Sequence, residues 1–295
     1  MRWLQLLNPA STFTKHFELL LADTPELREE VFRLRHKVFC EELGFYPLNS
    51  EGRERDEHDD HSRHLLLRCL RTGVAAGCIR LVLASRDQPE LRLPSEKICA
   101  GKIDRSTFDP ADCPRESIAE ISRLVVTREF RRGRRAESGR DAAAHADVGT
   151  PAHPPRSLYV QLGLYLGAIA LAHRFGIETL LFLIEPRLAR HFRRLGFPFQ
   201  QISGPVECRG TCVLSMARVG EPVTRLPFHM RPLYRVLDAR VTESLFDPTT
   251  TGFHRFGQRR AAIHGSRTHR DQVPDADDPL PWASTLLPYV PARSA

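Results

Sequence analysis

The most constraining feature of this 295-residue chain is the stretch Ile118–Val126, which reads IAEISRLVV. Its apolar, partly β-branched residues are typical of a buried β-strand. Glu120, Ser122 and Arg123 interrupt the apolar run. A carboxylate and a guanidinium are costly to remove from water, so inside a buried strand they need partners or a use. The stretch by itself leaves both interpretations open, a structural ion pair and a functional site.

Composition bounds the rest of the chain. Hydrophobic residues make up 41% of it, enough for a sizeable core, and the length suits one large domain or a domain with a tail. The net charge of +7 favours acidic partners without selecting nucleic acid, an anionic membrane or a protein. The seven cysteines show no paired CxxC spacing, and several lie in apolar runs. These features indicate reduced thiols in a cytoplasmic protein and no zinc site.

No segment is predicted to cross a membrane. The most apolar long run, Leu158–Ala172, is short for a membrane span and is interrupted by Gln161, so we expect a buried helix there. The apolar stretch at the N-terminus is too short for a convincing signal peptide.

Hydrophobic periodicity predicts strands alternating with helices. The helix that begins with Thr24 as N-cap and Pro25 as its first residue is expected to end at Gly44. The other predicted elements are, in chain order, a strand at His16–Ala22, a polar loop at Gly44–Arg63, a hairpin of Leu65–Leu70 and Val74–Leu83, an irregular stretch at Ala84–Ser117, the strand Ile118–Val126, helices at Ser157–Phe175 and Pro186–Leu195, and strands at Thr179–Ile184 and Thr211–Arg218.

The composition also predicts the domain organisation. Residues 1–220 are expected to form one domain, with a loop insertion at about 136–156. Residues 221–295 form a Pro-, Arg- and Thr-rich extension that we predict to be largely disordered. Within this extension, Met230–Leu245 has room for one more helix.

Four further groups of charged residues need an explanation. Arg35 and Phe39 stand one turn apart on the first helix, where an exposed arginine over an aromatic ring is the simplest interpretation. Arg80 lies inside the second hairpin strand and needs a partner. The loop sequence RDEHDDHSRH (Arg55–His64) fits a solvated charge run or substrate-facing carboxylates better than a metal site, because its mixed ligand spacing is weakly specific. The basic turn Arg131–Arg135 is a weak relative of a glycine-rich phosphate turn.

The order of these elements resembles the GNAT acyltransferase fold, and four motifs resemble the acyl-homoserine-lactone (autoinducer) synthases. LRHKVF (Leu34–Phe39) is similar to their LR-x-x-VF helix, and DEHD (Asp56–Asp59) to their DE-x-D loop. GCIRL (Gly77–Leu81) is similar to their GC-x-RL strand, and EISRLVV (Glu120–Val126) to their E-x-SRF-x-V strand. The implied fold is α/β (α+β), with a mixed central sheet flanked by helices and splayed at the central strand.

The later part of the chain resembles a different branch of these enzymes. The segments Glu185–Phe197 and Gly204–Val213 are similar to acyltransferases associated with the PEP-CTERM/exosortase system, which are also related to N-acyl amino acid synthases. This resemblance implies an N-acyltransferase that moves a fatty acyl group from acyl carrier protein, or from acyl-CoA, to the amine of an amino acid or a similar small acceptor. It implies no tightly bound cofactor and no metal.

Three alternatives stay open at this point. One is an autoinducer synthase that uses S-adenosylmethionine, and another is a catalytically inactive GNAT-like binding module. Nucleic-acid binding is the weakest alternative, because the sequence has no recognition helix and no aromatic–basic strand motif.

The resemblance also implies the residues of the site. Glu120 would act as the general base with Asp56 and Arg123 beside it, and Phe39 would line the acceptor site. On a regular strand, Glu120 and Arg123 would face opposite sides, so we expect a β-bulge between them. The remaining implied substrate-binding residues are Arg35, Asp59, Arg80 and Ser122, and the basic residues expected to contact the phosphopantetheine or the carrier protein are Arg131, Arg132, Arg134 and Arg135.

Overall fold

The computed structural model describes residues 9–131 apart from 86, 87 and 89, residues 156–194, 197 and 199–220 apart from 209, and residues 226–246. Most of the predicted loop insertion, three arginines of the basic turn, and the extension beyond residue 246 therefore lie outside the described residues. Among the helices that are described, none combines the length and the apolar character that crossing a membrane would take.

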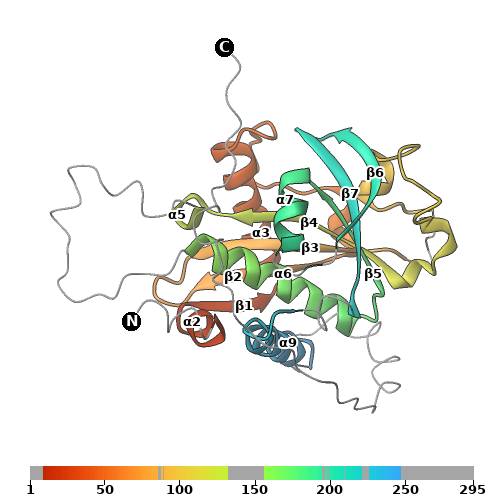
Figure 1. Ribbon diagram of the computed structural model, residues 1–295. Helices are drawn as coiled ribbons and strands as arrows, with labels where there is room; N and C mark the ends of the chain where they lie inside the picture. The colour runs from red at the N-terminus through yellow and green to blue at the C-terminus, as the bar shows by residue number, and fades with distance from the viewer. Residues whose placement is uncertain are drawn as a thin grey trace.

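A seven-stranded mixed sheet forms the centre of the molecule, with the strand order β1-β2-β3-β4-β5-β7-β6 (Figure 1). All neighbouring strands pair antiparallel except β4 and β5, which are parallel. This arrangement confirms the expected mixed α/β fold. The strands are β1 (Phe17–Leu21), β2 (Ser62–Cys69), β3 (Ala75–Leu83), β4 (Ile118–Val126), β5 (Thr179–Ile184), β6 (Gln200–Glu207) and β7 (Thr211–Arg218).

Helix α6 (Arg156–Arg174) makes the crossover between the parallel strands and lies across one face of the sheet (Figure 1). Its contact with the sheet is close at Gly167, where an added Cβ would lie 2.6 Å from the Leu19 side chain. Helices α2 (Pro9–His16), α7 (Pro186–Arg194) and α9 (Arg231–Phe246) contribute side chains to the same hydrophobic core.

The opposite face of the sheet is covered by α3 (Pro25–His36) and the segments that follow it. The hydroxyl of Thr24 accepts a hydrogen bond from the Leu27 N–H at 3.3 Å, which confirms the predicted N-cap. The predicted continuous α-helix is wrong in its last part, because the chain changes to a π-helix, η1 (Lys37–Glu42). Such wider turns occur often at functional sites.

Several elements were not predicted from the sequence. Strand β6 contains Gly204 and Pro205, which read as turn residues, but an edge strand tolerates proline because its outer N–H needs no partner. Helix α2 was also missed. The predicted polar loop contains a short 3-10 helix, η2 (Glu57–His61), because the side chains of Asp56 and Asp59 satisfy the N–H groups at its start.

Strands β4 and β5 separate part of the way along their length. They pair only from Ile118 to Ile121, although β4 continues to Val126. At the same place β4 has one extra residue relative to β3, and Arg123 adopts a left-handed backbone with φ of 52°. We predicted a bulge between Glu120 and Arg123, and the structure places it at Arg123, directly after Ser122. The splayed central strand is therefore present.

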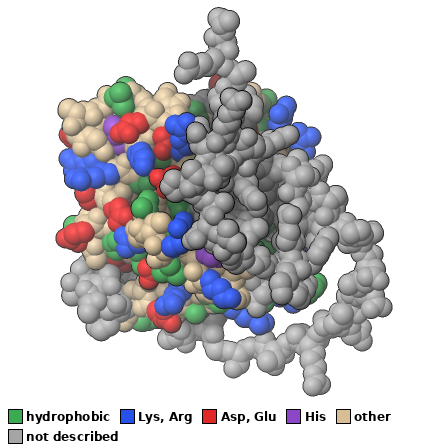
Figure 2. Space-filling model, turned by 90° about the vertical axis from the view of Figure 1, so that its left-hand side faces the viewer, with side chains coloured by type: hydrophobic (Ala, Val, Ile, Leu, Met, Phe, Trp, Pro, Cys, Tyr) green, Lys and Arg blue, Asp and Glu red, His purple; other side chains and the backbone are tan. Residues whose placement is uncertain are grey.

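The described surface carries charges of both signs. Figure 2 shows basic and acidic side chains interspersed over the described part of one side of the molecule. They do not gather there into one basic patch, although the whole chain carries a net charge of +7. The concentrated charge that matters for chemistry lies inside the molecule, next to the splayed strand.

Candidate active site

The first component of the candidate site is Arg35, which α3 holds fully buried. Its Nε donates to Glu54 Oε2 at 2.5 Å. Its Nη1 and Nη2 donate to the two oxygens of Asp59 at 2.7 and 3.1 Å. This two-pronged contact is the geometry for which a guanidinium is suited. From the sequence, the simplest expectation is an exposed Arg35. The structure instead buries it as an ion-pair partner of Glu54 and Asp59.

The second component is Arg80 on β3, also fully buried. Its Nη1 donates to Asp56 at 2.5 Å and to Asp59 at 2.9 Å, and its Nε donates to Ser122 Oγ at 3.1 Å. Its Nη2 has no hydrogen-bond partner within the described part of the chain. Arg80 therefore links the η2 segment to β4 and leaves one buried N–H group unpaired among the described residues.

The third component is Arg123, which the bulge of β4 presents to the same place. Its Nε donates to Glu54 Oε1 at 3.1 Å, and its Nη2 donates to Asp56 Oδ2 at 2.7 Å. The guanidinium also lies 5.3 Å from the centre of the Tyr46 ring, a cation–π distance. A regular strand would have turned this side chain to the other face of the sheet.

Three arginines and three carboxylates thus form one buried network, which we call the arginine–carboxylate cluster. Its charges balance, as a buried set of ions requires. Because most N–H groups of the arginines already point at carboxylates, their main role is to hold those carboxylates in place. The members of the cluster are Arg35, Arg80, Arg123, Glu54, Asp56 and Asp59.

The arginines keep Asp56 and Asp59 ionised. Burial by itself would raise the pKa of Asp59, but its hydrogen bonds and charge attraction to Arg35 and Arg80 hold that pKa far below its usual range. The pKa of Asp56 is also lowered, since its contacts with Arg80 and Arg123 outweigh its burial. The Asp56 side chain is 26% exposed, and Asp59 is fully buried. Asp56 is therefore a charged hydrogen-bond acceptor that a ligand can reach.

Glu120 lies on the same face of the sheet but outside this network. It stands opposite Val82, while Ser122, two residues further along β4, stands opposite Arg80. Glu120 is 2% exposed, and its Oε2 accepts a hydrogen bond from the Ser95 N–H at 2.8 Å. Burial raises the pKa of Glu120 to about 7. A carboxyl group with this pKa can take up and release a proton near neutral pH.

Phe39 belongs to an aromatic wall beside the cluster. It is partly buried on η1, and its ring stacks on Phe45 with 6.3 Å between the ring centres and meets Tyr46 edge-on at 6.0 Å. Tyr46 in turn touches the Arg123 guanidinium. An apolar surface therefore borders the charged cluster, as a site that orients an amphipathic substrate needs.

The histidines of the Arg55–His64 segment do not form a metal site. Within the described ranges, no three His, Cys, Asp or Glu side chains are grouped so that they could hold a metal ion. His64 is buried beside the cluster, with its Nε2 3.6 Å from Asp59, and burial lowers the pKa of His64 to about 3. It is neutral at physiological pH.

The basic turn is described only at its first residue. Arg131 forms an ion pair with Glu42, so it is not simply exposed. Arg132, Arg134 and Arg135 lie outside the described residues, and their expected contact with a donor stays a prediction.

Sequence reasoning missed Glu54 and Ser95. Glu54 pairs with Arg35 and Arg123 and is 7% exposed, yet it stands in a run of charged residues that suggests a solvated loop. Counting charges gives no signal for it, because the three arginines expected in the site were already matched by Asp56, Asp59 and Glu120. Ser95 acts through its backbone N–H, which no residue type reveals.

Comparisons with known proteins show which proteins this chain is similar to. Residues 34–138 match the family described as acetyltransferase (GNAT) domain. The acyl-homoserine-lactone synthases of Aeromonas salmonicida and Aeromonas hydrophila are each 26% identical to this chain over 179 residues, which cover 60% of this chain and 72% of theirs. The predicted homology to autoinducer synthases, and with it the acyltransferase class, is confirmed. The PEP-CTERM branch stays a prediction.

Solved structures also align with the chain. The crystal structure of TofI in a ternary complex with an inhibitor and MTA has 20% identity and a TM-score of 0.48, and the alignment covers 68% of this chain and 91% of that one. The N-acyl amino acid synthase FeeM from uncultured soil microbes has 14% identity and a TM-score of 0.45, with 71% and 94% covered.

Proposed function

We propose that this GNAT-domain homologue of the acyl-homoserine-lactone synthases is an N-acyltransferase that moves a fatty acyl group from a thioester to the amine of an amino acid or a similar small acceptor. The observation that carries the proposal is the buried Glu120, with a pKa raised to about 7, on the strand that splays next to the arginine–carboxylate cluster. A neutral amine is the nucleophile, so the reaction needs a base that works near neutral pH.

In the proposed reaction the acceptor nitrogen attacks the thioester carbonyl carbon. Glu120 takes a proton from the attacking amine, directly or through water. The tetrahedral intermediate carries a negative oxygen, which we propose is stabilised by backbone N–H groups of β4 beyond Ile121, where the pairing with β5 ends. The C–S bond then breaks, the amide forms, and the leaving thiolate receives the proton from Glu120.

The cluster would bind and orient the acceptor. Asp56 is its most exposed carboxylate, suited to accept a hydrogen bond from the neutral acceptor amine. Arg123 holds Asp56, and the free Nη2 of Arg80 can donate to a carbonyl or carboxylate of the acceptor. Phe39 and its aromatic neighbours would pack against the apolar part of the acceptor.

The proposed donor is an acyl group on acyl carrier protein, with acyl-CoA as the alternative thioester. Arg131, Arg132, Arg134 and Arg135 are proposed to meet the donor's phosphopantetheine or the acidic carrier protein. We also propose an N-acyl product and an association with the PEP-CTERM/exosortase system, both on the basis of the resemblance of the later segments of the chain. The proposed site of action is the cytoplasm, and residues 1–220 are proposed as the catalytic domain.

The second candidate is an autoinducer synthase, which the 26% identity to two acyl-homoserine-lactone synthases favours. The two candidates differ in the acceptor. Incubation with acyl-carrier protein and S-adenosylmethionine would give a lactone in one case, whereas a panel of amino acids would give acyl amides in the other. Product from neither acceptor with either carrier or CoA donors would favour an inactive binding module.

The role of Glu120 is tested by the Glu120→Gln variant, which keeps the shape of the side chain but cannot accept the proton. We expect kcat to fall by roughly 10²–10⁴-fold. In the wild type, kcat/KM should rise with pH through about 7, because the base works only when deprotonated. This limb should be missing in the variant. The matched control is Glu51→Gln, an exposed carboxylate with 67% exposure.

Two results would contradict the assignment. One is unchanged turnover in Glu120→Gln, and the other is a pH limb near 7 that persists in that variant. Either result would mean that another group acts as the base. The products of the incubations would still test the acyl transfer itself.

A further inference from the structure

A cavity of about 150 Å³ lies between α7 and the outer strands β6 and β7. It is on the face of the sheet opposite to Glu120. Ser215 lines the cavity and stands opposite Phe182, whose ring packs in the core under α6. Glu120 stands opposite Leu181, whose side chain belongs to the core on the other face of the sheet. The proposed acyl transfer does not use this cavity.

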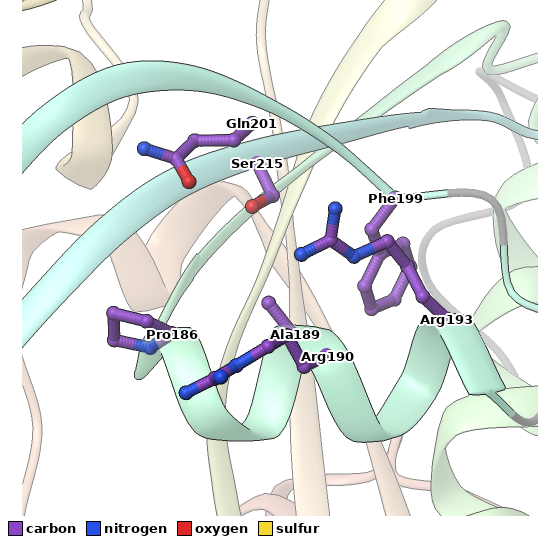
Figure 3. Close-up of a pocket in the computed structure, with 7 residues that line it drawn as sticks. All are labelled: Pro186, Ala189, Arg190, Arg193, Phe199, Gln201 and Ser215. Atoms are coloured by element: carbon purple, nitrogen blue, oxygen red, sulfur yellow. The ribbon is translucent and has the colours of Figure 1, made fainter.

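The wall formed by α7 is strongly basic. The helix reads PRLARHFRR and contains no acidic residue. Arg190 and Arg193 stand one turn apart, both are exposed, and both line the cavity. Figure 3 shows Arg193 reaching from the helix toward Ser215 and Arg190 extending along the helix toward Pro186. Neither guanidinium has a hydrogen-bond or ion-pair partner in the described chain. Two like charges one turn apart repel each other, so an anion between them would be stabilising.

The wall formed by β7 supplies a hydrogen-bond donor. The Ser215 hydroxyl is on a residue only 1% exposed, and its Oγ has no hydrogen-bond partner among the described residues. An unpaired buried hydroxyl is unfavourable unless a ligand or water satisfies it. The Gln201 amide beside it is held in place, because its Nε2 donates to the Ser203 carbonyl at 2.8 Å.

We propose that this cavity is a binding site for a phosphate group. Arg190 and Arg193 provide planar, permanently charged donors that match the oxygens of a phosphate, and the Ser215 hydroxyl supplies a third donor from the sheet. The volume suits a group of this size, since a water molecule takes about 30 Å³ in the liquid. The phosphate group could come from either of two ligands, the free ion or a phosphate ester on a larger molecule, and the proposed contacts are the same for both.

The test measures binding of inorganic phosphate to the full chain by calorimetry and by the midpoint of thermal unfolding. Wild type should bind phosphate saturably and unfold at a higher temperature in its presence. Arg193→Gln and Ser215→Ala should each weaken binding at least tenfold. The matched control is Arg187→Gln, since Arg187 is an exposed arginine of α7 that does not line the cavity. The control should bind within twofold of wild type.

Two further ligands separate the sources and the specificity. Tighter binding of 4′-phosphopantetheine than of inorganic phosphate, lost in Arg193→Gln, would identify the cavity as a site for phosphate esters, and equal binding that is lost in the same variant would identify the free ion as the ligand. Binding of acetate as tight as phosphate would overturn the proposal. So would the absence of saturable phosphate binding, or an equal loss in Arg187→Gln. Glu120→Gln should bind phosphate like wild type, so this outcome is independent of the acyl-transfer reaction.

Discussion

Arg123 shows how a single backbone conformation assembles the candidate site. A non-glycine residue with φ of 52° is strained by roughly 1–3 kcal/mol. The contacts of its side chain with Glu54 and Asp56 offset that strain, because they are charge-assisted hydrogen bonds in a buried place. Replacing Arg123 by a smaller residue would therefore remove one charge of the cluster and also the hydrogen bonds that offset the backbone strain at the bulge.

Glu54 is the residue on which two of the arginines depend. Glu54→Gln would leave Arg35 and Arg123 with less compensation for their charge in a buried environment. We expect the free energy of unfolding to fall by about 3 kcal/mol, as is typical when one partner of a buried ion pair is removed. Urea unfolding followed by circular dichroism measures this change.

The matched control is Glu51→Gln. Glu51 pairs with Arg53 at the surface, with 67% of its side chain exposed, and such pairs contribute about 0–1 kcal/mol. A loss in Glu54→Gln no greater than in this control would mean that the ion pairs of Glu54 with Arg35 and Arg123 do not stabilise the fold.

At the scale of the elements, the close approach of β3, β4 and α6 positions Arg80 and Ser122. Gly77 makes this approach possible, because an added Cβ would lie 2.3 Å from the Val125 carbonyl oxygen and 3.1 Å from the Leu164 side chain. The Val125 oxygen is backbone and cannot move without shifting the bulge. The geometry of the site therefore depends on a residue that carries no functional group.

Gly77→Ala should destabilise the protein by about 1–3 kcal/mol, because one extra methyl group overfills a tight contact. Thermal and urea unfolding would measure the change. Gly204→Ala on the edge strand is the control, since an added Cβ there meets nothing within 4 Å. The control should change stability by less than about 0.5 kcal/mol. Equal effects would contradict the tight packing between these elements.

For the whole molecule, α9 closes the core on the face opposite to the cluster. Leu237 of α9 is fully buried in the core that contains α6 and β1, and Arg174 of α6 pairs with Asp238 of α9. The predicted helix in the extension is present, although the boundary near residue 220 stays a prediction. The packing indicates that residues 226–246 stabilise the rest of the described chain.

Leu237→Ala should lower the free energy of unfolding by about 2–5 kcal/mol, as is usual for a leucine truncated in a core. Arg235→Ala, an exposed change on the same helix, is the control and should have little effect. A single cooperative transition at lower denaturant is expected for Leu237→Ala. If both variants unfold alike, α9 is not part of the cooperative core.

Periodicity alone was enough to predict most of the elements of the fold. The N-cap at Thr24, the strand Thr179–Ile184 and the crossover helix were recognisable because their signals lie within a few neighbouring residues. The edge strand β6 was not, because Gly204 and Pro205 are typical turn residues, and proline is tolerated in an edge strand for a reason that only the sheet order reveals.

The sequence by itself determined the mixed fold, the motif residues and the need for buried charges to find partners. Only the tertiary structure decided which charges meet: it joined Glu54 to Arg35 and Arg123, and it left Glu120 apart from the cluster with the backbone of Ser95. The physical reason is that hydrophobic pattern and local propensity act over short stretches of chain. Ion pairing, desolvation and the turn of a strand at a bulge depend on segments that are distant in sequence.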